Sequence, residues 1–308
     1  MIIYTTIEEI RGNMVKVSII TASYNYGNYI KETIESVISQ TYTDWEMIIV
    51  DDGSKDNSVE VIKSYCEKDS RIKLFQHENG ENKGLAETIQ LGISKATSEW
   101  IVFLESDDTI TPDYLKEKIK IIEQYPTVDF IFNDINMFGE ENVINNMERY
   151  FKKQKKLLSE ISFPANIFNY FEQLNVVPTF SAVMIKKELF NYLDFKVACQ
   201  PNLDWYLWIQ ASKNNKFYYL DKKLTNWRMH RDSQINNINP LLIYKWEIQK
   251  EKLFGYEPNL INKILKISKE MFYIKQIKSI YSLISPQSLI TTETLGLSCP
   301  SVSTFSTS

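Results

Sequence analysis

The sequence contains few cysteines and few glycines, and each shortage excludes a class of protein. The three cysteines of the 308-residue chain lie far apart and match neither a disulfide framework nor the ligand spacing of a metal site. We therefore expect reduced thiols in a cytoplasmic protein. The nine glycines include no pair spaced as G-x-G, and no G-x-x-x-x-G-K-[ST] segment occurs. These absences exclude most dehydrogenases and ATPases.

Long apolar runs and an excess of basic charge are also missing. No run of about 18 apolar residues occurs, so no transmembrane helix is predicted, and the N-terminus lacks the pattern of a signal peptide. The formal net charge of −4 argues against nucleic-acid binding. No clear basic amphipathic segment supports peripheral membrane association, which stays open. With 44% hydrophobic and 24% charged residues, the chain is expected to be globular, with one large core or two fused cores.

Apolar segments alternate with segments of helical periodicity in the first half of the chain. The expected strands are residues 14–20, 45–50, 72–75, 100–104 and 128–132. Helices are expected between them, and another over residues 114–125. Because the strands are continuously apolar, they are typical of a mainly parallel sheet covered on both faces, which places the fold in the α/β class.

The pattern is less regular after residue 133. We expect a loop over residues 139–146, strands over 181–185 and 217–220, and a helix over 203–211. Residues 241–284 predict helices interrupted near Gly255 and Pro258. Residues 285–308 are rich in serine and threonine and predict a disordered tail, and residues 1–13 predict a leader outside the main fold.

Two of the expected strands end in acidic residues. Residues 100–104 lead into residues 105–108, three of which are acidic, and residues 45–50 lead into Asp51 and Asp52. The carboxyl ends of parallel strands meet at one edge of the sheet, where open α/β sheets bind ligands. Carboxylates suit Mg²⁺ or Mn²⁺, which usually hold substrate phosphates as well. A single acidic cluster would be interpreted as a solvated turn, but two in one sheet predict a phosphate-and-metal site.

Five segments of the chain match, in order and spacing, the motifs of a known protein family. They are residues 17–25, 36–42, 48–54, 79–84 and 103–108, the last followed by Pro112. In their order and spacing, over roughly residues 14 to 232, the chain resembles the GT-A fold glycosyltransferases of family 2. The resemblance implies a Rossmann-like, mainly parallel central sheet flanked by helices, with a C-terminal helical extension. It also implies a donor-binding half over residues 14–112, an acceptor and base half over 113–239, and a helical region over 240–284.

The resemblance implies an inverting enzyme of cell-surface polysaccharide or glycoconjugate synthesis. Such an enzyme moves a sugar from a nucleotide donor, here a UDP-sugar, to a hydroxyl of a glycan or a lipid-linked acceptor. Charge builds on the leaving diphosphate, so a divalent metal, Mn²⁺ or Mg²⁺, is expected as cofactor. We expect a cytoplasmic enzyme; contact with the inner face of the membrane and a homo-oligomer formed through the C-terminal helices stay open.

For the donor nucleotide, the resemblance implies that Tyr24 stacks on the nucleobase, that Asp52 accepts its imino proton, and that main-chain groups of Ala22 also contact it. Without the resemblance, Asp51 and Asp52 are interpreted as an Asx-type turn. Lys83 lies in a loop flanked by glycines and is expected either to reach the diphosphate or to be an ordinary exposed lysine.

Glu105, Ser106 and Asp107 occupy the D-x-D position of the family, with Glu105 where the family usually has aspartate. The resemblance implies that Asp107 binds the metal directly. Glu105, one methylene longer, is expected at the donor ribose or the metal, with Ser106 beside it in the donor site. Asp108 is expected to orient Asp107 or to contact hydroxyls of the donor sugar.

Asp204 is the expected general base. It lies in a segment that resembles the acidic helix start of the family, with Leu203 where a glutamate is frequent. Burial and the helix N-terminus would shift its pKa in opposite directions. The alternative is a helix N-cap. Trp205 and Trp208 are candidates for a sugar-stacking wall, although a core position is favoured for Trp208.

Arg228, His230 and Ser233 match a late R-x-H-x-x-S segment of the family. Arg228 and His230 are expected on one strand face, in contact with the diphosphate, with His230 also at the metal. A lone histidine is more often structural, and that interpretation applies to His77.

Two alternatives to a glycosyltransferase stay open. A sugar-1-phosphate nucleotidyltransferase would need an early loop rich in glycine, arginine and lysine, which residues 23–28 do not provide. The departures at Glu105 and Leu203 keep a catalytically silent nucleotide- or glycan-binding protein open as an alternative, and donor binding without turnover would identify it.

Overall fold

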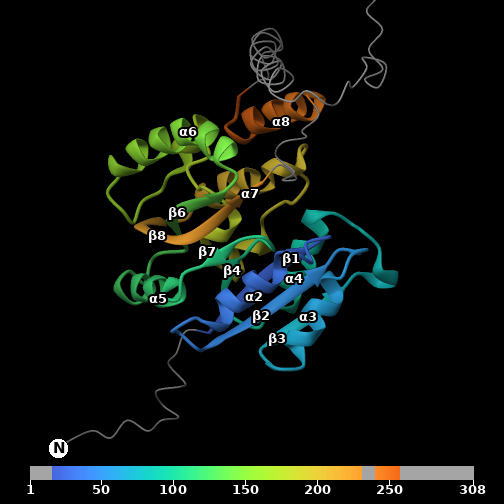
Figure 1. Ribbon diagram of the computed structural model, residues 1–308. Coiled ribbons are helices and arrows are strands. Elements are labelled where there is room, and N and C mark those ends of the chain that lie inside the picture. The colour runs from blue at the N-terminus through green and yellow to red at the C-terminus, as the bar shows by residue number, and fades with distance from the viewer. Residues whose placement is uncertain (1–15, 231–239, 257–308) are drawn as a thin grey trace, which may run out of the picture. The chain divides into compact units, whose positions relative to one another are not determined.

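The computed structural model describes residues 16–230 and 240–256, which all belong to one compact unit, Met1–Pro258. In this part of the chain the strands form one eight-stranded sheet with the order β3-β2-β1-β4-β7-β6-β8-β5 (Figure 1). The parallel strands are β1 (Val17–Ser23), β2 (Trp45–Asp51), β3 (Ile72–Gln76) and β4 (Trp100–Phe103). These are the strands that their apolar runs predict, and all seven residues of β2 are buried.

The second half of the sheet has mixed directions. Its strands are β5 (Thr109–Ile110), β6 (Phe130–Gly139), β7 (Val183–Lys186) and β8 (Phe217–Met229). Strand β7 is antiparallel to both β4 and β6, β8 is parallel to β6, and β5 is antiparallel to β8. Strands β6 and β8 are longer than predicted because they pair with each other along most of their length, with register shifts at Asp134.

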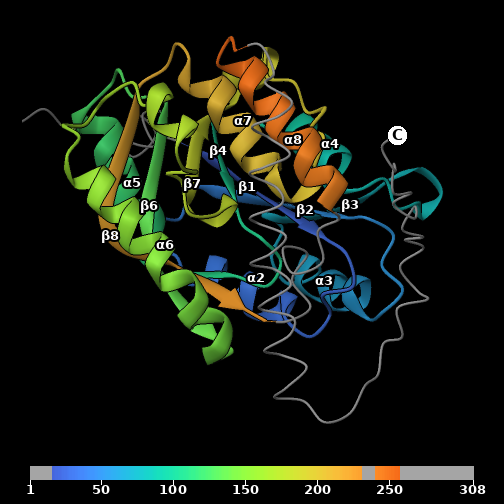
Figure 2. The same ribbon diagram turned by 90° about the horizontal axis from the view of Figure 1, so that it is seen from above.

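Helices cover both faces of the sheet, as expected. One face carries α4 (Leu85–Lys95) and α7 (Leu203–Ser212), and the other carries α2 (Ile30–Ile38) and α3 (Ser58–Cys66) (Figure 2). Helix α5 (Tyr114–Gln124) packs into the same core as α2 and α3. The sheet has a hydrophobic core on each face, and neighbouring residues of a strand pack into different ones. Ile20 packs into the core that contains α4, and Ile19 into the core that contains α2. Burying each such side chain contributes about 1.5–3 kcal/mol.

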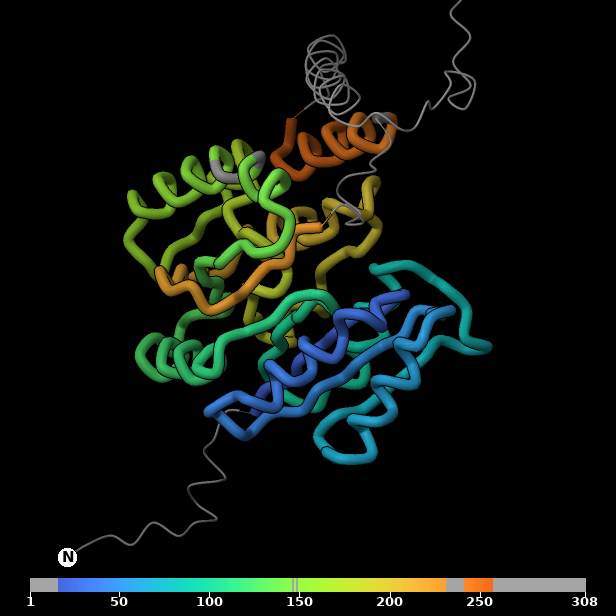
Figure 3. Tube along the Cα trace, in the orientation of Figure 1, coloured from blue at the N-terminus to red at the C-terminus, as the bar shows by residue number. Residues whose placement is uncertain are grey.

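Residues 139–146 are not the loop that their polarity predicts. Gly139 ends β6, and residues 141–146 begin α6 (Glu141–Ser159), a helix that contacts β6 and β8 (Figure 3). Its apolar residues are spread from the first turn, which holds Val143 and Ile144, to the last, where Leu158 is buried. The exposed side of a helix and a loop have the same composition, so polarity alone could not separate them.

Helix α8 (Pro240–Leu253) confirms the start of the predicted C-terminal helical region, and its Trp246 packs into the core formed by α4 and α7. The predicted leader 1–13, the tail 285–308, the helices after residue 256 and Ser233 lie outside the described residues. Among the helices of residues 16–230 and 240–256, none combines the length and the apolar character that a membrane span requires.

Candidate active site

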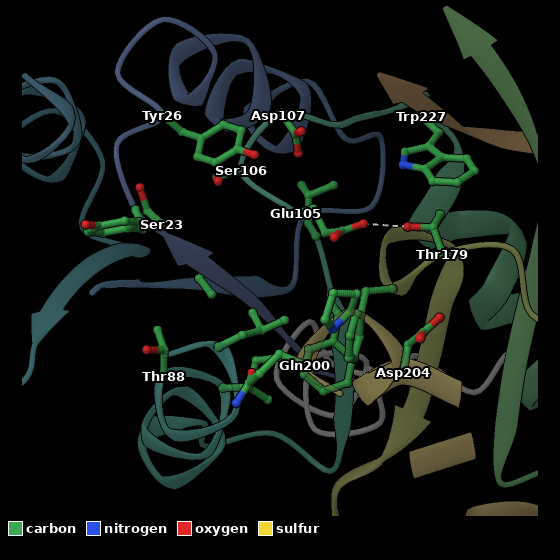
Figure 4. A pocket seen from close by; sticks show the side chains of 18 of the residues that line it. Ser23, Tyr26, Thr88, Glu105, Ser106, Asp107, Thr179, Gln200, Asp204 and Trp227 are labelled. Atoms are coloured by element: carbon green, nitrogen blue, oxygen red, sulfur yellow. Dashed lines mark hydrogen bonds between the residues drawn. The ribbon is translucent and has the colours of Figure 1, made fainter. Parts of the chain in front are cut away.

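A cavity of about 870 Å³ opens at the carboxyl ends of β1, β2 and β4 (Figure 4). This is the edge at which the sequence predicts a ligand site. The structure brings together in its lining eight of the predicted residues: Ala22, Tyr24, Asp52, Glu105, Ser106, Asp107, Asp204 and His230. Two other predicted residues, Lys83 and Arg228, are not part of the lining.

Hydrogen bonds from the segment just before β7 and from β8 hold the acidic segment after β4. The hydroxyl of Ser181 donates to Asp108 Oδ2 at 2.6 Å and accepts the N–H of Glu105 at 3.0 Å. The hydroxyl of Thr179 donates to Glu105 Oε2 at 2.5 Å, as the dashed line in Figure 4 shows. Asp108 Oδ1 accepts the N–H of Arg228 at 2.9 Å. Asp108 is therefore a buried anchor of the loop.

Asp107 meets His230, which lies 123 positions later in the chain: Asp107 Oδ2 and His230 Nε2 are 2.9 Å apart. The pairing of β5 with β8 joins these distant segments. The ring of Tyr29 stacks on the imidazole with a centroid distance of 5.4 Å, and Tyr26 meets it edge-on at 6.1 Å. The two predicted metal ligands thus share one wall of the cavity.

Arg228 is not part of the cavity lining, although it is only two residues from His230. Its Nε donates to the main-chain oxygen of Asp107 at 2.8 Å, and its Nη2 forms an ion pair with Glu32 Oε2 at 2.5 Å. Strand β8 ends at Met229, so the alternation that would place both side chains on one face does not extend to His230. Arg228 therefore stabilises the main chain of the acidic loop through its hydrogen bonds to Asp107 and Asp108.

The negative charge of the acidic segment after β4 is poorly balanced by positive charge from the residues that line the cavity. Burial, followed by the charge of Asp107, raises the pKa of Glu105 to about 8, and the hydrogen bond from Thr179 offsets only part of this. Burial also raises the pKa of Asp108 well above its usual range. Among the described residues that line the cavity, none is a lysine or an arginine. The site is therefore suited to a cation.

Asp107 and His230 fit a divalent metal, because a carboxylate and an imidazole are both ligands that Mn²⁺ accepts. Within residues 16–230 and 240–256, no group of three or more histidine, cysteine, aspartate or glutamate side chains is arranged to hold a metal. A metal on these two residues would therefore need further ligands from substrate or water, which is usual for Mg²⁺ bound beside phosphates.

At the other end of the cavity, Asp52 anchors the loop before α4. Its Oδ1 accepts the N–H of Lys83 at 2.7 Å and its Oδ2 accepts the N–H of Gly84 at 2.9 Å. The side chain of Lys83 is exposed, so this residue contributes its main chain to the site. Tyr24 is 41% exposed at the rim. Gly53 is required beside Asp52, because its φ is +80° and a Cβ would lie 2.7 Å from the oxygen of Gly80.

His77, interpreted from the sequence as structural, lies directly behind Asp52. Its Nε2 is 3.0 Å from Thr88 Oγ1 and 3.5 Å from Asp52 Oδ1. The hydroxyl of Thr88 donates to the oxygen of Gly84, so the imidazole is the donor in its contact with Thr88. A signal was available in the sequence: His77 closely follows the apolar run 72–75, and parallel strands end at the same edge of the sheet.

Asp204, the second residue of α7, lines the cavity on the side away from Ser23 and Thr88 (Figure 4). Burial raises its pKa to about 6, while the N–H of Trp205 and the side-chain amide of Asn175 hold it down. Trp205 also lines the cavity, whereas Trp208 is fully buried in the core, as favoured from the sequence.

Aromatic residues that the sequence did not single out also line the cavity. Tyr150 and Phe151 of α6 and Trp227 of β8 line the cavity, and the rings of Phe151 and Trp227 meet edge-to-face with a centroid distance of 5.7 Å. Figure 4 shows Trp227 beside Thr179, on the same side of the cavity as Asp204. The end of the cavity next to Asp204 is therefore largely aromatic.

Comparison with known proteins agrees with this geometry. The sequence model of glycosyl transferase family 2 matches residues 18–193. An uncharacterized glycosyltransferase of Methanocaldococcus jannaschii, MJ1057, is 29% identical over 246 residues, which cover 78% of this chain and 77% of that protein. Other curated relatives are longer, and the matched part spans 29–40% of their length.

Two solved structures have a similar fold. S. aureus TarS 1–349 in complex with UDP-GlcNAc has a TM-score of 0.58 and 19% identity, over 81% of this chain and 69% of that one. The mannosyltransferase PcManGT from Pyrobaculum calidifontis, in complex with GDP-Man and Mn²⁺, has a TM-score of 0.55 and 16% identity, over 80% and 66%. The chain belongs to glycosyl transferase family 2, a family of glycosyltransferases, and has the predicted GT-A fold.

Proposed function

We propose that the protein is an inverting glycosyltransferase that takes a UDP-sugar as donor and a hydroxyl of a glycan or lipid-linked saccharide as acceptor. One observation carries the proposal: Asp52, the pair Asp107 and His230, and Asp204 all line a single cavity. A sugar transfer needs a nucleotide site, a place for the diphosphate and a base for the acceptor. The cavity offers groups of the right chemistry for each.

The donor nucleotide is proposed to lie between Tyr24 and Asp52. The half-exposed ring of Tyr24 is free to stack on a base, and Asp52, already held by two amides, is oriented to accept an imino proton. The main chain of Ala22 lines the same end. We favour uracil because TarS was solved with UDP-GlcNAc.

Asp107 and His230 are proposed to hold Mn²⁺ or Mg²⁺. A cation there supplies positive charge to a leaving diphosphate. The absence of lysine and arginine from the described lining residues supports this, as does the Mn²⁺ in the complex of PcManGT. Glu105, fixed by Thr179, is proposed to face the donor ribose or the metal, beside Ser106.

Asp204 is proposed as the general base. It would take the proton of the acceptor hydroxyl while the oxygen attacks the anomeric carbon on the face opposite the diphosphate, which inverts the configuration. A pKa of about 6 leaves the carboxylate mostly ionised at neutral pH but more basic than an exposed aspartate.

The acceptor is proposed to be a saccharide held against Trp205, Trp227 and Phe151. Aromatic rings offer flat apolar faces to the C–H faces of sugars and have polar edges for hydroxyls. A lipid-linked saccharide would bring the enzyme to the inner face of the membrane, and cell-surface glycan or glycoconjugate synthesis is the process that we infer.

The test is nucleotide release and sugar transfer across a panel of nucleotide sugars, with Mn²⁺ or with EDTA. We expect one donor to turn over in a metal-dependent way in the parent and in Glu123→Ala, a control in an exposed acid of α5. Asp107→Ala should lose turnover. If no donor binds to the folded parent, or if Asp107→Ala turns over at the parental rate, the proposed site is wrong.

A further inference from the structure

We propose that Asn175 is a positioning residue for Asp204, held in place by helix α6. Asn175 is buried, and its Nδ2 donates to Asp204 Oδ2 at 2.9 Å. The inference rests on the proposed function, because it assigns Asn175 the task of orienting the proposed base. Neither residue's partner is predicted by the sequence, since 29 positions separate them.

The orientation of the Asn175 amide is determined by its own partners. Its Oδ1 accepts the N–H of Val177 at 3.3 Å. Turning the amide over would place an N–H group against that N–H donor and an oxygen against the carboxylate of Asp204, and both contacts would be repulsive. The side chain can therefore present only its N–H group to Asp204, while its oxygen stays with the N–H of Val177.

Helix α6 fixes the main chain of Asn175. The hydroxyl of Tyr150 donates to the oxygen of Asn175 at 3.0 Å, and Nε2 of Gln154 donates to the same oxygen at 2.9 Å. Tyr150 and Gln154 are four residues apart and so lie on one side of the helix. Two bonds from a regular element hold Asn175 more firmly than a loop would by itself.

A donor at this place favours the charged form of Asp204, because a hydrogen bond to a carboxylate stabilises the ion. The other titratable groups around Asp204 are Glu105 after β4 and Tyr150 of α6. On α8, which packs against α7, Lys250 and Glu247 form an ion pair, and Lys250 lies over the ring of Trp205. Asn175 contacts Asp204 directly and is uncharged, so its removal would change the pKa of Asp204 without changing the net charge of the protein.

The first test measures the pKa of Asp204 by carboxyl-carbon NMR on protein with labelled aspartate, with Asp204→Asn to assign the signal. In Asn175→Ala we expect the pKa to rise by about one unit, because a hydrogen bond to an ionised group is lost. The matched control is Asn166→Ala. Its amide donates to the oxygens of Ser212 and Lys213 at the far end of the same helix, so the pKa of Asp204 should not move.

The second test is the pH profile of kcat for the donor and acceptor found in the panel. The acidic limb should move to higher pH in Asn175→Ala, so that the ratio of kcat at pH 6 to kcat on the plateau falls about fivefold below the parental ratio. The donor KM should stay unchanged. A loss of kcat that is the same at every pH, with an unmoved limb, would mean that Asn175 has only a structural role.

Should Asn175→Ala fail to fold, Asn175→Asp keeps the shape of the side chain and replaces the donor by an acid, which should raise the pKa of Asp204 further. An unchanged pKa in a folded variant overturns the inference. The NMR titration does not depend on turnover, so it separates this result from a failure of the proposed function. That failure would appear as sugar transfer retained in Asp204→Asn.

Discussion

The hydroxyl of Ser181, just before β7, donates to Asp108 Oδ2, in the loop after β4, at 2.6 Å, and both residues are fully buried. The same hydroxyl accepts the N–H of Glu105. One small side chain thus connects the first and last residues of the acidic segment and fixes the backbone that carries Asp107. The chemistry proposed for Asp107 depends on this contact.

Ser181→Ala should destabilise the protein by about 1–3 kcal/mol, because it leaves a buried acid without its donor. Denaturant unfolding measures this. The control is Ser98→Ala, since the hydroxyl of Ser98 is buried with no hydrogen-bond partner in the structure, and its loss should be close to neutral. Equal stability of the two variants would show that the Ser181–Asp108 bond contributes nothing.

The activity should depend on pH through Asp204. Burial raises its pKa from 3.8 to about 6, and the group works as a base only when it has lost its proton. The rate of transfer should therefore increase as the pH rises through about 6 and level off above it. Asp204→Asn should remove most of the activity and leave donor binding intact. A parental rate that is flat from pH 5 to pH 8 would contradict the assignment.

Metal binding should depend on both Asp107 and His230. We expect Mn²⁺, titrated in the presence of UDP and followed by the loss of free-ion signal in electron paramagnetic resonance, to bind the parent and to bind His230→Ala at least about tenfold more weakly. His77→Ala is the control, because the only other histidine of the chain lies behind Asp52. Equal Mn²⁺ affinity in all three proteins would place the metal elsewhere.

Trp227→Ala should impair use of the acceptor. Loss of an aromatic contact costs about 0.5–1.5 kcal/mol, so the acceptor KM should rise by about twofold to tenfold. Trp227→Phe should keep most of the affinity, and donor hydrolysis without acceptor should be unaffected in both variants. If the KM for the donor rises instead, Trp227 belongs to the donor site and the aromatic end of the cavity has been misassigned.

The strands of the first half of the sheet, and the acids at their ends, follow from the sequence alone. Strands β1, β2 and β4 are mostly apolar because both of their faces are buried, and such runs are a local signal. The polar Ser18 of β1 and Glu46 of β2 are also buried, where the hydroxyl of Ser18 donates to Glu46. Asp52 and the residues around Asp107 come directly after these runs. Their meeting at one edge needs only the rule that parallel strands end together.

Contacts between distant segments were decided by the tertiary structure. The approach of Asp107 to His230 and of Asn175 to Asp204 depends on the register of β5 on β8 and on the path of the chain after α6, and no local pattern encodes either. Arg228 is absent from the cavity lining because neighbouring residues of a strand face opposite ways, and the adjacent Trp227 lines the cavity. Residue types and strand ends are properties of short segments, whereas the direction of a side chain depends on every element that packs around it.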